Sequence, residues 1–359
     1  MLSSVLTLLL AIPLFAQRYH LACEQCHTVI PELNGFGQNF REHGYQLDLP
    51  KHGTTGVAVR YQLQYQVDPV NSRRWTPGGV LLSNVDVGKI AAFVHYNLGA
   101  QGGPSGLYLG YLATYNAHTQ MLYRAGLFEL PLPQSPGQRL DDLQQYGYYG
   151  AHVGLNDLPL SSPRWGAQVE RTIGNAVVDA VLDTGEFKGA AYGGAPVPTG
   201  ETTFAQTPEL GLFAREFFGS AVIGVEGLEG TRGIVLGGKP AFDDAYDRGA
   251  FWSQYTYGRL QLQGEQWWGR DFNADGFGTL VGSAGGYLRA KYYFDDDHAY
   301  LGVRYDAYEN PVITRDMTYY GAFMLFGRAR VLLQQVQTIG GTGSFGGALT
   351  VAFPPPLNY

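Results

Sequence analysis

Charged residues are scarce in this chain of 359 residues, at 15% of the sequence, although hydrophobic residues make up 45%. A water-soluble domain usually carries about a quarter charged residues. The net charge of −7 leaves no basic stripe, so the chain lacks the electrostatic footprint of a nucleic-acid-binding protein. No uninterrupted apolar run reaches about 18 residues, so the sequence predicts no transmembrane helix.

Cysteine is also nearly absent, because the chain holds only Cys23 and Cys26. A redox Cys-x-x-Cys motif is expected beside a βαβ pattern, and none is evident here. A structural zinc site needs four Cys or His ligands, usually in two close pairs, and the chain has no second pair. A lone disulfide between the two cysteines would leave the neighbouring His27 unexplained.

The two cysteines belong to the motif Cys23-Glu24-Gln25-Cys26-His27, which is the attachment pattern of c-type haem. Each thiol adds across one haem vinyl group, and the two-residue spacer matches the separation of the vinyls. The adjacent His27 then reaches the iron from the proximal side. The sequence therefore predicts one covalent haem c, bound through Cys23 and Cys26 with His27 as an iron ligand.

The motif does not determine the sixth iron ligand. His43 and His52 lie close to it in sequence, and we expect one of them to be the distal ligand. An open position that binds water is the alternative. His–Met ligation would require Met121, Met317 or Met324, all far along the chain, to face the haem.

The N-terminal region predicts export followed by a small haem segment. Residues 5–15 are an apolar stretch of secretory type, so residues 1–16 are predicted to be a signal peptide cleaved after Ala16. A short membrane anchor is the alternative, but the run is too short to span a bilayer as a helix. Residues 17–54 then form the monohaem segment, in which Leu33, Phe36 and Phe40 predict one apolar helical face. Gly44 is suited to end that helix.

From residue 55 to residue 359 the hydrophobic pattern has the period of two that is typical of strands, as in Val57–Val67. Further strands are predicted at Ala91–Leu98, Leu107–Asn116, Met121–Leu130, Tyr148–Asn156, Trp165–Ile173, Ala176–Leu182, Pro208–Phe217, Ala221–Leu228, Gly233–Gly238, Ala250–Tyr257, Arg259–Trp268, Ser283–Phe294, His298–Tyr308, Thr318–Phe326, Arg328–Ile339 and Leu349–Phe353. A soluble β-sandwich or propeller is one architecture for such strands, and an outer-membrane barrel is the other.

Three features favour the barrel. The strands have about the length that crosses a membrane with tilt, aromatic pairs such as Trp267-Trp268 gather near their ends, and the polar faces suit a wet lumen. Bacterial single-chain barrels have even strand numbers, so we expect a mainly β, transmembrane barrel of about 16 strands, with the helical haem segment plugging its lumen. Long loops are predicted at 68–83, 131–146, 185–206 and 269–280.

One of these loops begins like a calcium-binding loop, at Asp271-Phe272-Asn273-Ala274-Asp275-Gly276. The twelfth position is Gly282 rather than Glu, and no flanking helices are predicted, so a hairpin loop of turn-forming residues is the better interpretation. Other acidic residues are expected in solvated loops, or at a rim that attracts cations: Asp141, Asp142, Asp243, Asp244 and Asp247.

The stretch Ala22–Tyr45 resembles the fused cytochrome–porin family of outer-membrane iron-oxidising cytochromes. The likeness rests on the haem motif, on Pro31-x-Leu33-Asn34-x-Phe36-Gly37, and on Phe40 and Gly44-Tyr45. Beyond this stretch it is architectural. The resemblance implies a haem segment inside a barrel that takes electrons from extracellular ferrous iron and passes them to periplasmic cytochromes. It carries over Cys23, Cys26 and His27 as haem-binding residues and assigns no iron-binding residue.

Three functions remain open on the sequence. The first is an electron-transfer cytochrome in the bacterial outer membrane, which oxidises extracellular Fe(II) through a lumenal haem c and delivers electrons to a periplasmic c-type cytochrome or another carrier. The second is a porin that transports small solutes and whose haem gates the channel. The third is a soluble periplasmic β-protein with a tethered cytochrome. We expect the first.

Overall fold

The computed structural model describes residues 19, 21, 23–29, 32–42, 45–47, 55–67, 73–99, 105–134, 142–143, 146–150, 153–156, 160–186, 202–205, 207–235, 242–295, 299–310, 312–325 and 329–353. The predicted signal peptide and the candidate ligands His43 and His52 lie outside these residues. No helix in the described ranges is long and apolar enough to cross a membrane.

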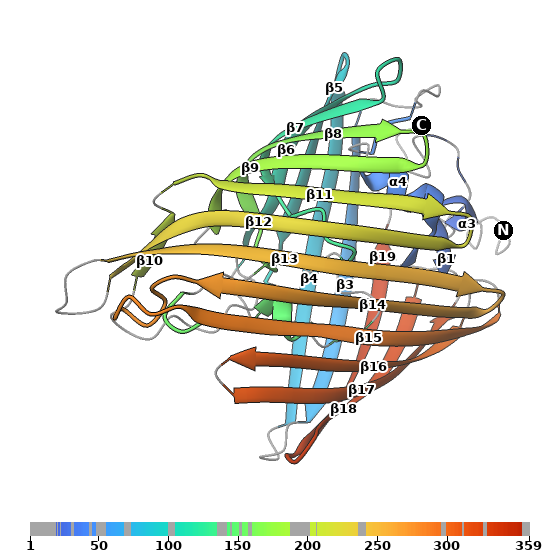
Figure 1. Cartoon of the computed structure of the whole chain (residues 1–359). Coiled ribbons are helices and arrows are strands. Elements are labelled where there is room, and N and C mark those ends of the chain that lie inside the picture. The colour runs from blue at the N-terminus through green and yellow to red at the C-terminus, as the bar shows by residue number, and fades with distance from the viewer. Residues whose placement is uncertain are drawn as a thin grey trace, which may run out of the picture.

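A small unit comes first, and a long series of strands follows it (Figure 1). The small unit contains α3 (Cys23–Cys26), β1 (His27–Val29), β2 (Glu32–Leu33) and α4 (Gly35–Glu42). The barrel strands are β3 (Thr55–Val67), β4 (Arg73–Val87), β5 (Ile90–Asn97), β6 (Gly106–Asn116), β7 (Met121–Phe128), β8 (Arg164–Ile173), β9 (Ala176–Glu186), β11 (Glu209–Phe218), β12 (Ala221–Val235), β13 (Phe242–Tyr257), β14 (Leu260–Asp271), β15 (Val281–Asp295), β16 (Ala299–Asn310), β17 (Val312–Leu325), β18 (Ala329–Thr338) and β19 (Gly343–Phe353).

These strands form a closed antiparallel barrel. Each pairs with its neighbours in chain order, β9 pairs with β11, and β19 returns to pair with β3 from Phe345↔Val67 to Phe353↔Val59. The short β10 (Thr202–Ala205) adds only an extra pairing at the end of β12. Within the described ranges sixteen strands therefore close the ring, which confirms the predicted barrel and its strand number.

The barrel has an apolar outside and a polar inside. On β14 the side chains of Leu262 and Trp268 are exposed, whereas the alternate residues Gln263, Glu265 and Asp271 are buried inside. The other strands repeat this alternation, and exposed aromatic residues stand near both ends, including Trp75, Trp165, Trp268, Phe218, Tyr257, Tyr292 and Phe294. An apolar band with aromatic girdles is the exterior of a transmembrane barrel.

The two ends of the barrel differ. Two-residue turns join several hairpins at one end, and Gly88, Gly174, Gly219 and Gly258 take the positive φ that such turns require. The longer connections lie at the other end. Figure 1 shows α3 and α4 at the end with the short turns. We call it the turn end and the opposite one the loop end; in bacterial barrels the short turns face the periplasm.

Three predictions about individual segments were wrong. Residues 73–83, expected in a loop, belong to β4, where Pro77 is tolerated because β5 pairs with β4 only from Val80 onward. Tyr148–Asn156 is not a barrel strand: it contains the short helix η2 (Tyr148–Gly150), and its described residues 148–150 and 153–156 lie inside the lumen. Gly233–Gly238 is not a separate strand, because its described part continues β12.

Candidate functional site

The haem motif begins the small unit as one helical turn, α3, followed directly by β1 at His27. The Cys26 carbonyl accepts the backbone N–H of Asn34 at 3.0 Å. A Cβ placed on Gly37 would lie only 1.9 Å from the same carbonyl oxygen. The backbone of the motif and the start of α4 therefore touch, and only a glycine fits at position 37.

Helix α4 begins and ends with identifiable signals. The Asn34 side chain accepts the backbone N–H of Gly37 at 2.9 Å, which is an N-cap bond. At the other end the backbone N–H of Tyr45 donates to the Phe40 carbonyl at 2.9 Å, the six-to-one bond of a Schellman motif. This confirms the predicted helix at Phe36 and Phe40, but Leu33 lies in β2 and not in the helix, and Gly44 lies outside the described residues.

Aromatic side chains surround the motif. Phe40 is buried and packs edge-on against Tyr19 at 5.6 Å, within a cluster that Cys26 also contacts. Phe36 stacks on Phe40 at 6.5 Å but keeps 44% of its surface exposed. The Cys-x-x-Cys-His turn with an adjacent apolar, partly uncovered aromatic surface fits a covalently attached porphyrin, which would cover that surface.

The end of the small unit enters the turn end of the barrel and contacts its inner wall. Tyr45 stacks on Phe93 of β5 at 5.2 Å, and Gln46 donates to the Ala113 carbonyl of β6 at 3.1 Å. Arg124 of β7 donates to the Arg41 carbonyl at 3.4 Å. Three wall strands therefore hold the segment that follows the haem motif.

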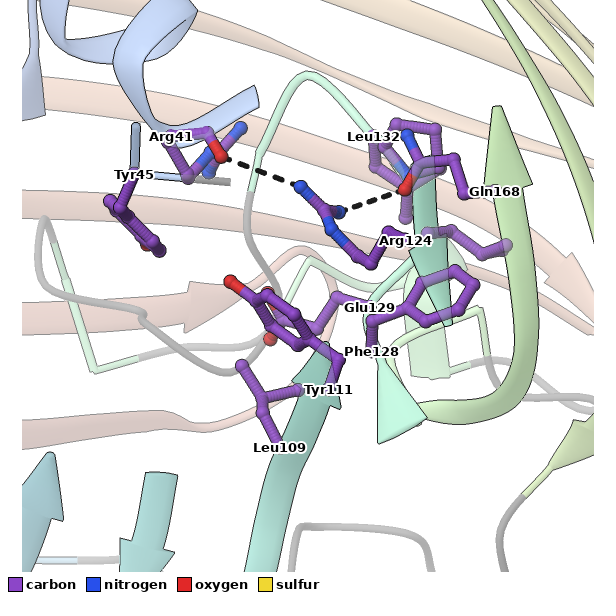
Figure 2. Close-up of a pocket in the computed structure, with 11 residues that line it drawn as sticks. Arg41, Tyr45, Leu109, Tyr111, Arg124, Phe128, Glu129, Leu132 and Gln168 are labelled. Atoms are coloured by element: carbon purple, nitrogen blue, oxygen red, sulfur yellow. Dashed lines mark hydrogen bonds between the residues drawn. The ribbon is translucent and has the colours of Figure 1, made fainter. Parts of the chain in front are cut away.

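A small cavity of about 50 Å³ lies at this junction (Figure 2). Its lining comes from α4, from the wall strands β6, β7 and β8, and from the residues directly after β7. The lining residues are Arg41, Tyr45, Leu109, Tyr111, Arg124, Phe128, Glu129, Leu130, Pro131, Leu132 and Gln168. A cavity of this size holds a few water molecules or one small polar group.

The connection between β7 and β8 folds into the lumen; its described parts are 129–134, 142–143, 146–150, 153–156 and 160–163, and we call it the lumen segment. Arg304 of β16 is fully buried between Asp142 and Asp306. The Tyr149 hydroxyl donates to Glu265, and the Asn156 amide donates to Asp244 at 2.7 Å and to Asp271 at 3.0 Å. These polar contacts fix the lumen segment to the wall strands β13, β14 and β16.

The acidic residues predicted for solvated loops are instead divided between wall and lumen. Asp142 is buried on Arg304, and Asp244 is buried on Asn156, because inward-facing carboxylates need partners when the lumen is filled. Asp243 and Asp247 lie on β13, and Asp247 forms an exposed pair with Arg270 at 2.8 Å. Asp141 lies outside the described residues.

The loop between β14 and β15 is a hairpin loop of turn-forming residues, as predicted. Asp275 accepts the Phe277 backbone N–H at 2.9 Å, and the Asn273 side chain accepts the Gly278 N–H at 2.6 Å. Hydrogen bonds to the Asp275 carboxylate, first from the Thr279 hydroxyl, lower the pKa of Asp275. The described residues contain no group of three His, Cys, Asp or Glu side chains arranged for a metal.

The sequence indicated the haem motif but not the wall residues that contact the segment after it. Cys23, Cys26 and His27 are contiguous at the turn end, while both predicted distal histidines lie outside the described residues. Met324 shares the buried face of β17, so one methionine does face inward. Arg124 was missed, although an arginine on the inward face of the predicted strand Met121–Leu130 is a signal that could have found it.

Comparisons with known proteins bear on the barrel alone. No protein-family model matches the sequence, and no curated protein matches it. Solved structures with the same fold include the outer membrane channel DcaP of Acinetobacter baumannii, with 10% identity, a TM-score of 0.59, and coverage of 83% of this chain and 96% of that chain.

Two further structures have the same architecture. The anion-selective porin from Comamonas acidovorans has 13% identity, a TM-score of 0.58, and coverage of 84% of this chain and 99% of that chain. Salmonella typhi OmpF, in a complex with daunomycin, has 8% identity, a TM-score of 0.60, and coverage of 83% and 97%. The chain is thus similar in fold to outer-membrane porins.

Proposed function

We propose that this protein is an outer-membrane porin-type channel that carries one haem c in its periplasmic mouth, where the haem segment controls passage of small solutes. Two contacts carry the proposal: Tyr45 stacks on Phe93, and Arg124 donates a hydrogen bond to the Arg41 carbonyl. They place the end of the haem segment against the inner wall of the barrel. The porin likeness of the barrel supports the channel, and the Cys23–His27 motif supports the haem.

The residues that would hold the haem are Cys23 and Cys26 for covalent attachment and His27 for the iron. When bound, a haem supplies one-electron redox chemistry and a change of charge at the iron. Phe36 and Phe40 would exclude water from one side of it, and the cap at Asn34 would keep α4 against the motif. Because α4 leads into the wall contacts of Tyr45, a change at the motif is transmitted to the channel mouth.

Conductance across a planar lipid bilayer tests this proposal. The purified protein should conduct ions, and its conductance should differ between the oxidised and the dithionite-reduced states. A variant with both Cys23→Ser and Cys26→Ser should lose the haem stain that survives denaturation, and its conductance should no longer respond to dithionite. A channel that conducts equally in both states would reject redox gating, and the absence of conductance in both would reject the channel itself.

One observation favours electron transfer as a second function. The lumen segment enters from the loop end and the haem segment from the turn end, and their described residues meet at a cavity of only about 50 Å³. A lumen with so little free space would hinder the passage of solutes but not the transfer of electrons. In this proposal extracellular ferrous iron reduces the haem, which then passes the electron to a periplasmic c-type cytochrome or another carrier.

Stopped-flow absorbance separates the two functions. Oxidised protein in detergent is mixed with ferrous iron, and the reduced haem bands are followed. Rapid appearance of these bands would support the Fe(II) oxidase, because it makes iron a competent donor. Reduction by dithionite without any reduction by iron would reject iron as the donor and leave the channel proposal in place.

A further inference from the structure

Two arginine residues from separate elements line the cavity at the junction of the haem segment and the barrel. Arg41 belongs to the last turn of α4, and Arg124 belongs to β7, more than eighty residues later in the chain. Figure 2 shows Arg124 between Arg41 and Gln168, with Tyr111 beside Arg124. The cavity is therefore built jointly by the haem segment and the wall.

Arg124 is held in one orientation. It donates to the Gln168 side-chain oxygen at 2.8 Å and to the Arg41 carbonyl at 3.4 Å. Its guanidinium lies 4.9 Å from the centre of the Tyr111 ring, and Gln168 is itself fixed by donating to buried Asp179. A guanidinium group that is already held in place loses little conformational entropy when it binds a ligand. Its planar set of N–H donors matches the two oxygens of a carboxylate.

The charge of the cavity also favours an anion. Arg41 and Arg124 contribute two positive charges, and Glu129 is the acidic residue among the lining residues. The Glu129 carboxylate accepts the Tyr108 hydroxyl, whose ring is fully buried. These three charged residues leave a formal charge of +1, which one carboxylate group would balance.

We propose that this cavity is a carboxylate-binding site in which Arg124 is the main ligand and Arg41 assists. The carboxylate comes either from a haem propionate or from a small free carboxylate in the lumen. The first source rests on the proposed function, because it needs the attached haem. In that case a barrel residue binds the haem of the N-terminal segment and tethers the segment to the wall.

The test compares Arg124→Gln with two other variants of the full-length protein in detergent. Arg124→Lys keeps the positive charge, and Arg270→Gln removes a guanidinium from the exposed Asp247 pair, far from the cavity. The haem reduction potential is measured by spectroelectrochemistry. Acetate binding is measured by calorimetry at constant ionic strength, on these proteins and on the haem-free variant Cys23→Ser, Cys26→Ser.

A propionate occupant predicts a lower reduction potential in Arg124→Gln, because the uncompensated propionate stabilises the ferric haem. Arg124→Lys should retain most of the original potential, and Arg270→Gln all of it. Acetate should then bind to the haem-free variant but not to the haem-loaded protein. A free-carboxylate occupant predicts instead an unchanged potential and acetate binding by the haem-loaded protein, weakened about tenfold or more in Arg124→Gln.

The proposed site would be overturned by two results together: a reduction potential that is unchanged in Arg124→Gln, and acetate binding that is equally strong in Arg124→Gln and in the native protein. A native protein without covalent haem would refute the haem proposal separately, because acetate titration of native protein and Arg124→Gln still decides whether the cavity binds a carboxylate. A folded barrel in Arg124→Gln is verified by its circular dichroism, so loss of binding cannot be mistaken for loss of the fold.

Discussion

Single residues decide whether the haem motif can form its compact turn. Gly37 lies so close to the Cys26 carbonyl that no side chain fits, and Asn34 caps the helix that carries Gly37. At the same scale, Arg124 shows how one wall residue can recognise the small unit, by donating to the Arg41 carbonyl. Both contacts involve backbone atoms, so they depend on the path of the chain more than on the partner's side chain.

Replacing Gly37 by Ala should reduce haem attachment. The new Cβ would have to displace the Cys26 carbonyl, an overpacking change that typically costs about 1–3 kcal/mol. The ratio of haem to protein, measured by absorbance after denaturation, should fall. Gly35→Ala is the matched control, since a Cβ there meets nothing within 4 Å. Equal haem content in the two variants would contradict the tight contact.

Among the elements, the lumen segment does most to distinguish this barrel from an open pore. Its polar residues are anchored on wall strands, and its aromatic residues pack on the wall, as Tyr148 does on Trp267 at 5.7 Å. Asp142 and Arg304 form its strongest anchor, because both side chains are almost fully buried. Without Asp142, Arg304 would still be paired with Asp306 of its own strand at 2.6 Å, but its bond to the lumen segment would be lost.

Asp142→Asn should therefore loosen the lumen segment. The substitution removes one of the two carboxylates that bind Arg304, a charge-assisted hydrogen bond that contributes about 1.5–3 kcal/mol, so the segment should leave the wall more often and single-channel conductance should rise. Asp247→Asn is the control, because its partner Arg270 is 62% exposed and exposed pairs contribute about 0–1 kcal/mol. If both variants conduct like the native protein, the Asp142 pair does not hold the segment.

High pH should release the same segment. Burial, and then the charge of Glu265, raise the pKa of Tyr149 well above its usual value near 10. A raised pKa stabilises the docked segment below about pH 10, and this stabilisation is lost as the pH rises through the folded pKa. Conductance should thus rise in alkali, and Tyr149→Phe should weaken that rise. An identical alkaline rise in Tyr149→Phe would assign it to other groups.

The whole molecule is organised by two surfaces, an apolar exterior and a polar, largely filled interior. The exterior makes the barrel suited to lipid, while the closure of β19 on β3 removes the free strand edges. The two plugging segments enter from opposite ends and meet near Tyr111. In the proposed function, this arrangement would keep a haem attached to the motif at the turn end of the barrel.

A lipid-facing exterior predicts a cost that depends on depth. Leu288 lies in the middle of β15 and is 66% exposed, whereas Leu280 is 59% exposed in the loop before that strand. Leu288→Arg should lower the free energy of unfolding from lipid vesicles by about 2–4 kcal/mol, and Leu280→Arg by about 0–1 kcal/mol. Urea titration of tryptophan fluorescence measures both. Similar losses in the two variants would argue against a membrane-embedded β15.

The sequence alone determined the barrel and the haem motif because both depend on local rules. Strand alternation has a period of two wherever one face is apolar, and Cys23, Cys26 and His27 are neighbours in the chain. The pattern predicted seventeen segments, because Tyr148–Asn156 was wrongly included, β12 was divided and β4 was missed; the expected total of sixteen came from the rule that such barrels have even strand numbers.

Only the tertiary structure decided what fills the lumen. Tyr148–Asn156 resembles a strand in sequence because it begins with aromatic residues that require burial. In the structure these residues are buried inside the lumen, where Tyr148 packs on Trp267 of the wall, and they do not belong to a strand of the barrel. Likewise, nothing near Arg124 in the sequence indicates Arg41, since the two meet only when β7 closes beside α4. Contacts between residues far apart in the chain follow from closure of the ring, and local patterns carry no record of them.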